Sequence, residues 1–172
     1  MVCVALSVGC ASRQGTETRA EPSMRFRDLA AVVKADSGEA RPIRGTGYLR
    51  YPDDERRRNI EASFAIAFLL DTEGRVEYET VSFLSGAPLA FFDEACHWLR
   101  SQRFAPVRRQ GTPQRSLVVS DLTFTLDRSG NPGTPPSGRR AVPVNVEKYR
   151  RELAAMDVAA LAGKLERHRH CT

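Results

Sequence analysis

The feature that most constrains the fold is a pair of apolar segments on either side of a tight turn, in residues 62–83. In residues 62–70 the larger apolar side chains recur at every second position, which predicts a half-buried strand. The turn at residues 71–74, Asp-Thr-Glu-Gly, ends in a glycine that can take the left-handed conformation of a hairpin with a bulge. The segment therefore predicts a β-hairpin, and with it a sheet.

The returning strand changes the phase of its apolar alternation. Val76 and Tyr78 share one phase, whereas Val81 and Phe83 follow the other. An inserted residue reverses the alternation of a strand, so a β-bulge near residues 79–81 would turn all four side chains toward one core. We therefore expect a bulged hairpin.

Two helices and one more strand are predicted around this hairpin. Tyr51-Pro52 precedes three acidic and then three basic residues. This order of charges matches the dipole of a helix and is typical of a short helix that begins near Pro52. A second helix follows the break at residues 85–88, with an apolar stripe at Phe92, Ala95, Cys96 and Leu99, where Cys96 is interpreted as a small buried hydrophobe. Residues 116–126 alternate again, with Val118, Leu122, Phe124 and Leu126 on one side. The order predicts an α+β fold with the helices on one face of the sheet.

The flanking regions carry weaker signals. The apolar spacing of residues 24–34, at Phe26, Leu29, Ala30 and Val33, predicts a short helix within an otherwise polar tether. Residues 127–144 are rich in Pro, Gly and Arg and predict a flexible linker. Residues 146–167 predict a terminal helix that either docks on the domain or meets a partner.

The N-terminus resembles the end of a bacterial lipoprotein signal peptide. A short apolar run at residues 2–8 is followed by Gly-Cys-Ala-Ser, which favours lipidation of Cys10. Two alternatives are an uncleaved apolar N-terminus and a truncated transmembrane helix, although seven apolar residues do not span a bilayer. No basic residue precedes the run, and a start codon further upstream would explain that departure from the signal-peptide pattern.

Composition argues against several classes of function. The net charge is +5, but only three of the 26 basic residues are Lys and the arginines are scattered, so we expect no nucleic-acid binding. Cys3, Cys10, Cys96 and Cys171 show no zinc-ligand spacing, and residues 168–171 are interpreted as a solvated tail, so no metal or cofactor is expected. His97 has only its helix neighbours Cys96 and Asp93 as catalytic partners, so no enzyme is predicted.

Six short segments in a fixed order resemble the C-terminal domain of the TonB family over about residues 48–127. They are Tyr51-Pro52, Asn59-Ile60-Glu61, the turn from Asp71 to Val76, Ser85-Gly86, Phe92-Asp93-Glu94-Ala95 and Arg103-Phe104-Ala105-Pro106. The resemblance implies an αββαβ domain whose antiparallel three-stranded sheet carries two helices on one face. It divides the chain into a signal segment (1–10), a tether (11–47), this domain (48–127), and a linker with a terminal helix (128–172).

The resemblance also implies a function in the periplasm. Proteins of this family grip an extended segment of an outer-membrane transporter and pass on energy from an inner-membrane proton-driven complex. The segment pairs with the free edge of the last strand, so main-chain hydrogen bonds supply the affinity. Transferred to this sequence, the partner-binding edge comprises Arg115, Ser116, Leu117, Val118, Val119, Ser120, Asp121 and Leu122, with Ser120 and Asp121 as orienting groups. The alternative reading of this strand is an edge blunted by charge.

A second hypothesis follows from what a full transducer carries in addition. Such a protein has an anchor helix and a long proline-rich spacer, and this sequence predicts neither. We therefore do not expect this chain to transduce energy by itself. The chain would then be a lipid-anchored envelope assembly protein. Its edge strand would serve homodimerisation, or its helix at 146–167 would contact a partner.

Overall fold

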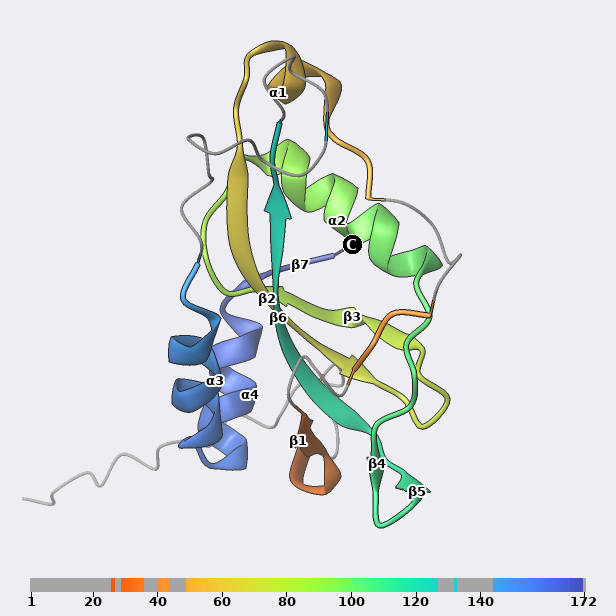
Figure 1. Cartoon of the computed structure of the whole chain (residues 1–172). Coiled ribbons are helices and arrows are strands. Elements are labelled where there is room, and N and C mark those ends of the chain that lie inside the picture. The colour runs from red at the N-terminus through yellow and green to blue at the C-terminus, as the bar shows by residue number, and fades with distance from the viewer. Residues whose placement is uncertain are drawn as a thin grey trace, which may run out of the picture.

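The computed structural model describes residues 26, 29–35, 40–43, 49–126, 132 and 144–171. They form a five-stranded sheet with the order β1-β6-β2-β3-β7, with helices on both faces, and a separate β4-β5 hairpin (Figure 1). The helices are α1 (Asp53–Arg57), α2 (Leu89–Ser101), α3 (Val146–Ala154) and α4 (Val158–Glu166). The strands are β1 (Val33–Ala35), β2 (Ala62–Leu70), β3 (Val76–Phe83), β4 (Arg108–Arg109), β5 (Thr112–Pro113), β6 (Ser116–Phe124) and β7 (Arg169–His170).

The predicted α+β fold is confirmed. The elements α1, β2, β3, α2 and β6 follow one another as expected, and β2 lies between β3 and β6 in antiparallel pairing. The prediction of three strands is incomplete, because β1 adds to β6 in parallel and β7 adds to β3 in antiparallel orientation. Pairings of three and two residues are too short to leave an alternation in the sequence.

The predicted bulge is present and is larger than one residue. Ala67 lies opposite Ser82 and Leu69 lies opposite Glu77, so residues 78–81 of β3 face a single residue of β2. The Thr80 hydroxyl bridges the gap, because it accepts from the Leu69 N–H at 2.9 Å and donates to the Glu77 carbonyl at 2.6 Å. The odd number of extra residues reverses the alternation. One core consequently receives Val76, Tyr78, Val81 and Phe83.

The first core lies between the sheet and α2 and is largely aromatic. Phe64 of β2 contacts Phe92 of α2 edge to face, with ring centroids 5.2 Å apart. Tyr51 closes one end of this core by donating its hydroxyl to the Ile60 carbonyl at 2.5 Å. Burial, and then the carboxylates of Glu61 and Glu55, raises the pKa of Tyr51 to about 12. Tyr51 therefore acts as a neutral donor that ties the start of α1 to the start of β2.

The second face of the sheet is also buried, so the prediction of a half-buried β2 is wrong. Ala65, Ala67 and Leu69 are fully buried beneath α3 and α4, which contribute Leu153, Leu161 and Leu165 to a second core. The expected terminal helix is two helices, because the Asp157 side chain caps α4 by accepting from the Ala160 N–H at 2.8 Å. Of the two alternatives for this segment, docking on the domain is the one observed (Figure 1).

The short helix expected over residues 24–34 is not observed in the part of this segment that the structure describes. Leu29–Ala31 form one 3-10 turn and Val33–Ala35 form strand β1. Phe26 and Leu29 nevertheless face the second core, as their spacing suggested. Pairing with β6 overrides the helical spacing, because local propensity is weaker than a tertiary contact.

The solvated tail expected at residues 168–171 is wrong as well. His170 pairs with Ser82 of β3, and Cys171 is 4% exposed. Cys171 forms a disulfide with Cys96 of α2, with a Cα–Cα distance of 5.6 Å across a sequence separation of 75 residues. Cys96 is thus a cross-link, and not the free buried hydrophobe that its helical spacing suggested.

Several predicted segments lie outside the described residues. They are the signal segment 1–10 with Cys10, the tether at 11–22, and residues 127–131 and 133–143 of the linker. Within the described ranges, no helix combines the length and the hydropathy needed to cross a bilayer.

The turn between β2 and β3 is locked to the segment after α2. Gly74 has φ +78°, and its carbonyl accepts from the Phe104 N–H at 2.9 Å. A Cβ at this position would lie 1.9 Å from the Phe104 carbonyl oxygen. Two of the segments that carried the family resemblance therefore meet here in direct backbone contact.

We expect Gly74→Ala to be strongly destabilising. The new methyl group would collide with backbone at a left-handed position, so the loss in unfolding free energy should be at least about 3 kcal/mol. Gly111→Ala is the matched control, since Gly111 has φ +81° but no atom within 4 Å of the added Cβ, and it should cost about 1 kcal/mol. Urea unfolding followed by circular dichroism measures both. Equal losses would contradict the role of the backbone contact.

We expect the double variant Cys96→Ser/Cys171→Ser to lose about 4 kcal/mol of stability, because the disulfide closes a long loop and restricts the unfolded chain. The measurement is guanidinium unfolding without reductant, compared with the unmodified chain under reducing conditions. The two samples should have the same midpoint. A variant as stable as the oxidised wild type would show that the bond adds nothing.

Candidate functional site: the edge of β6

The residues predicted to bind a partner lie on β6 and just before it. β6 pairs with β2 along its full length, from Ser116 opposite Leu70 to Phe124 opposite Ala62. On its other side, β1 pairs with Ser116–Val118 only. The rest of β6 forms the edge of the antiparallel core.

The hydrogen-bonding direction of each β6 residue can be deduced from β2. The Ala65 carbonyl accepts from Leu84 N–H at 2.8 Å, and the Leu69 N–H donates to Thr80, so both groups point away from β6. Their partners in register are Asp121 and Leu117. In an antiparallel ladder such pairs direct their N–H and C=O groups outward on both strands. The outward-facing backbone groups of β6 are therefore those of Leu117, Val119, Asp121 and Thr123.

β1 occupies the first of these outward positions. Leu117 lies opposite Lys34 in a parallel register. This register directs the N–H and C=O groups of Leu117 to the residues before and after Lys34. The Lys34 ammonium in turn donates to the last carbonyls of α3, those of Leu153 at 3.1 Å and Ala154 at 2.8 Å. These carbonyls form the negative end of the helix dipole, where a cation is stabilising.

Arg150 of α3 occupies the second outward position. Its Nε and Nη2 atoms donate to the Val119 carbonyl at 3.3 and 3.1 Å, and its guanidinium also pairs with Glu147. A side chain thus satisfies the carbonyl that a neighbouring strand would otherwise bond. α3 lies beside β6 at this point, as Figure 1 shows.

The open part of the edge begins at Asp121. No strand in the described part of the chain pairs with the outward backbone groups of Asp121 and Thr123. The Asp121 side chain is exposed, and the Thr123 hydroxyl shares a hydrogen bond with Ser63 at 3.1 Å. Compared with the predicted edge at residues 115–122, the open edge is shorter and lies closer to the end of the strand.

Arg115, the charged residue at the start of the predicted edge, has a structural contact. Its Nε and Nη2 atoms donate to the two Glu77 oxygens at 2.5 and 2.6 Å. This bidentate pair is half-buried and links the start of β6 to β3. Ser120 points to the opposite face from Asp121, and its hydroxyl lies 3.4 Å from the Asp121 carbonyl.

A groove of about 230 Å³ lies where β1, β6 and α3 meet. Its apolar lining comes from Leu117, Val119 and Leu153, and its charged lining comes from Lys34, Glu147, Arg150 and Arg151. Sequence reasoning identified the β6 residues of this groove but missed Lys34 and Arg150. Neither side chain has a distinguishing sequence signal, since each depends on a contact with a distant segment.

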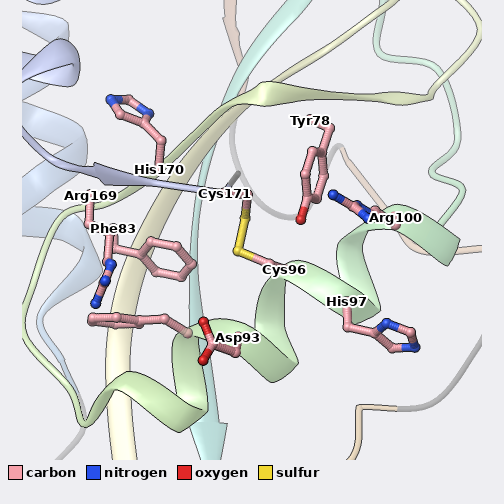
Figure 2. Close-up of a pocket in the computed structure, with 10 residues that line it drawn as sticks. Tyr78, Phe83, Asp93, Cys96, His97, Arg100, Arg169, His170 and Cys171 are labelled. Atoms are coloured by element: carbon pink, nitrogen blue, oxygen red, sulfur yellow. A yellow bond between two sulfur atoms is a disulfide. The ribbon is translucent and has the colours of Figure 1, made fainter.

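A second pocket, of about 270 Å³, surrounds the disulfide (Figure 2). The Arg100 guanidinium lies 4.2 Å from the centre of the Tyr78 ring, and His97 points away from the two sulfur atoms. Because Cys96 is bonded to Cys171, it has no thiol with which His97 could form a catalytic pair. Among the described residues, no three His, Cys, Asp or Glu side chains are grouped as metal ligands. The described residues of this pocket therefore offer neither a Cys96–His97 pair nor a three-ligand metal cluster.

The comparisons with known proteins concern the middle of the chain. A solution NMR structure of the Pseudomonas aeruginosa TonB C-terminal domain is similar at 21% sequence identity, covering 55% of this chain and 95% of that chain with a TM-score of 0.44. No curated protein matches the chain. Residues 47–126 match the family described as the Gram-negative bacterial TonB protein C-terminal, a protein-interaction domain of the cell envelope.

Strands β1 and β7 and helices α3 and α4 lie outside the matched residues. The matched segment contains α1, β2, β3, α2 and β6, which are the elements of the predicted αββαβ order. Domains of this family interact with outer-membrane transporters. Residues 47–126 therefore form a domain that belongs to the TonB C-terminal family.

Proposed function

We propose that this protein binds an extended segment of an outer-membrane transporter by strand addition along β6, in the periplasm. The observation that carries the proposal is the row of outward backbone groups on β6, of which Asp121 and Thr123 have no strand partner in the described part of the chain. Such groups bond any extended chain that is placed beside them. The family match supports a transport role for the domain.

The disulfide supports the proposed compartment. The bond between Cys96 and Cys171 joins two half-buried or buried residues and closes a large part of the domain. Structural disulfides persist in oxidising compartments, of which the bacterial periplasm is one. The same proposal includes an inner-membrane proton-driven complex as the source of energy. The described domain would then be the part of the protein that contacts the transporter.

The geometry favours this role over a terminal helix that recruits a partner. Leu153, Leu161 and Leu165 bury the apolar sides of α3 and α4 against the protein's own sheet. The larger apolar side chains of the two helices are therefore turned inward, apart from Val158 at the start of α4, which is 44% exposed. Homodimerisation through the edge would use the same backbone groups of β6, and analytical ultracentrifugation at increasing concentration distinguishes it from capture of a peptide.

We expect Asp121→Pro to weaken peptide binding at least tenfold. Proline removes the outward N–H of Asp121 but leaves the bonds between β6 and β2 in place, because those come from the alternate residues. The probe is a set of synthetic peptides that copy the N-terminal segments of mature outer-membrane transporters from the same genome, titrated by isothermal calorimetry.

The matched control is Asp121→Asn, which changes the side chain and keeps the N–H, and it should bind as the unmodified chain does. Weakening by the asparagine variant alone would assign recognition to the carboxylate and not to the backbone. Absence of binding to every transporter peptide would refute the proposed function.

We also propose that Cys10 carries a lipid and anchors the protein to a membrane. The apolar run before Gly9-Cys10 and the small residues after it support this. Expressed from its own locus, the protein should have a mature mass that begins at a diacylated Cys10 and should sediment with membranes. Cys10→Ser should release it into the soluble periplasmic fraction. A wild-type chain that retains residues 1–9 without added mass would exclude lipidation.

A further inference from the structure

The two contacts that cover the β6 edge involve the same backbone groups that a partner strand would need. β1 faces the N–H and C=O groups of Leu117, and the Arg150 guanidinium bonds the Val119 carbonyl. A strand that pairs with β6 from residue 117 to residue 123 must therefore replace both. Asp121 and Thr123 alone offer a partner only the last part of the edge.

The two contacts are joined into one unit. Lys34 of β1 donates to the carbonyls of Leu153 and Ala154, at the end of the helix that carries Arg150. The Lys34 carbonyl, which points away from β6, accepts from Arg109 at 3.4 Å. β1 is thus held from both sides by side chains, and its position depends on α3.

The contact of β1 with the edge is limited. It comprises three residue pairs, and the groove of about 230 Å³ lies between Lys34, β6 and α3. A cavity beside a contact means that fewer atoms are in van der Waals range, so less dispersion energy is lost when the contact opens. Lys34 itself is exposed. A segment held by a short strand pairing opens at low free-energy cost compared with global unfolding.

We propose that β1 and Arg150 form a displaceable cover over the partner-binding edge, and that a partner strand binds by displacing β1. This inference rests on the proposed function, because it assigns regulation to the same edge. The cover makes the apparent affinity for a partner lower than the affinity of the open edge, by the fraction of molecules in which the edge is open. Any change that releases Lys34 from α3 favours the open state.

Two variants of the full chain test the cover. Lys34→Met keeps the aliphatic stem but removes the donors to Leu153 and Ala154. Ala35→Pro removes the N–H that the register directs to the Leu117 carbonyl. The matched control is Lys148→Met, which makes the same charge change on an exposed position of α3 without a contact to β1.

The first readout needs no partner. Amide hydrogen exchange followed by NMR should show Leu117 protected and Asp121 unprotected in the unmodified chain. Both test variants should accelerate exchange at Leu117 at least tenfold, and Lys148→Met should leave it unchanged. Equal exchange of Leu117 and Asp121 in the unmodified chain would overturn the cover.

The second readout is titration with the transporter peptides described above. Both test variants should bind about tenfold more tightly than the unmodified chain and Lys148→Met, because the peptide no longer competes with β1. Equal binding to all four proteins would overturn the cover and leave the proposed function standing. If the test variants exchange faster at Leu117 but no protein binds any peptide, the cover and the proposed function are both refuted. β1 would then serve only to complete the sheet.

Discussion

The structure depends on the burial of β2 on all sides. This strand pairs with β3 and β6 along its two edges, and both of its faces are covered. A nine-residue ladder with β6 fixes which β6 residues face outward, since a slip of one residue would move Phe64, Ile66 and Phe68 from the first core to the face of the second core. The orientation of the candidate edge is therefore a consequence of packing in the core.

The two faces of β2 are covered by different parts of the chain. Phe64 and Phe68 pack against α2 and Phe104, all of which lie within the residues that match the family. Ala65 and Ala67 pack against α3 and α4, which lie outside them. Small side chains allow helices to approach the sheet closely, so the second face is suited to a helical cover. The same cover brings Arg150 to the edge of β6.

The sequence could predict those elements whose period extends over several residues. Alternation and helical spacing repeat often enough to predict four elements, β2, β3, β6 and α2. The change of phase at Val81 predicts the position of the bulge. β1, β7 and the disulfide have no such repeat and depend on distant partners. The burial of Ala65 and Ala67 could not be predicted, because small residues occur on buried and exposed faces alike. Asp157 is a residue type that favours an N-cap, but the apolar spacing continues past it, so the spacing alone predicts one helix where the structure has two.

The sequence placed the candidate site on β6, but it could not predict which backbone groups of that strand are covered. An unpaired edge is a liability for any sheet, because it pairs with other chains indiscriminately. Sequence reasoning offered two readings of β6, a binding edge and a blunted edge, and treated them as alternatives. In the proposed cover, the contacts of Lys34 and Arg150 make the two readings compatible. A cover that bonds the same backbone groups as a ligand protects the edge when no ligand is present. A ligand must then bind the edge more favourably than the cover does in order to displace it.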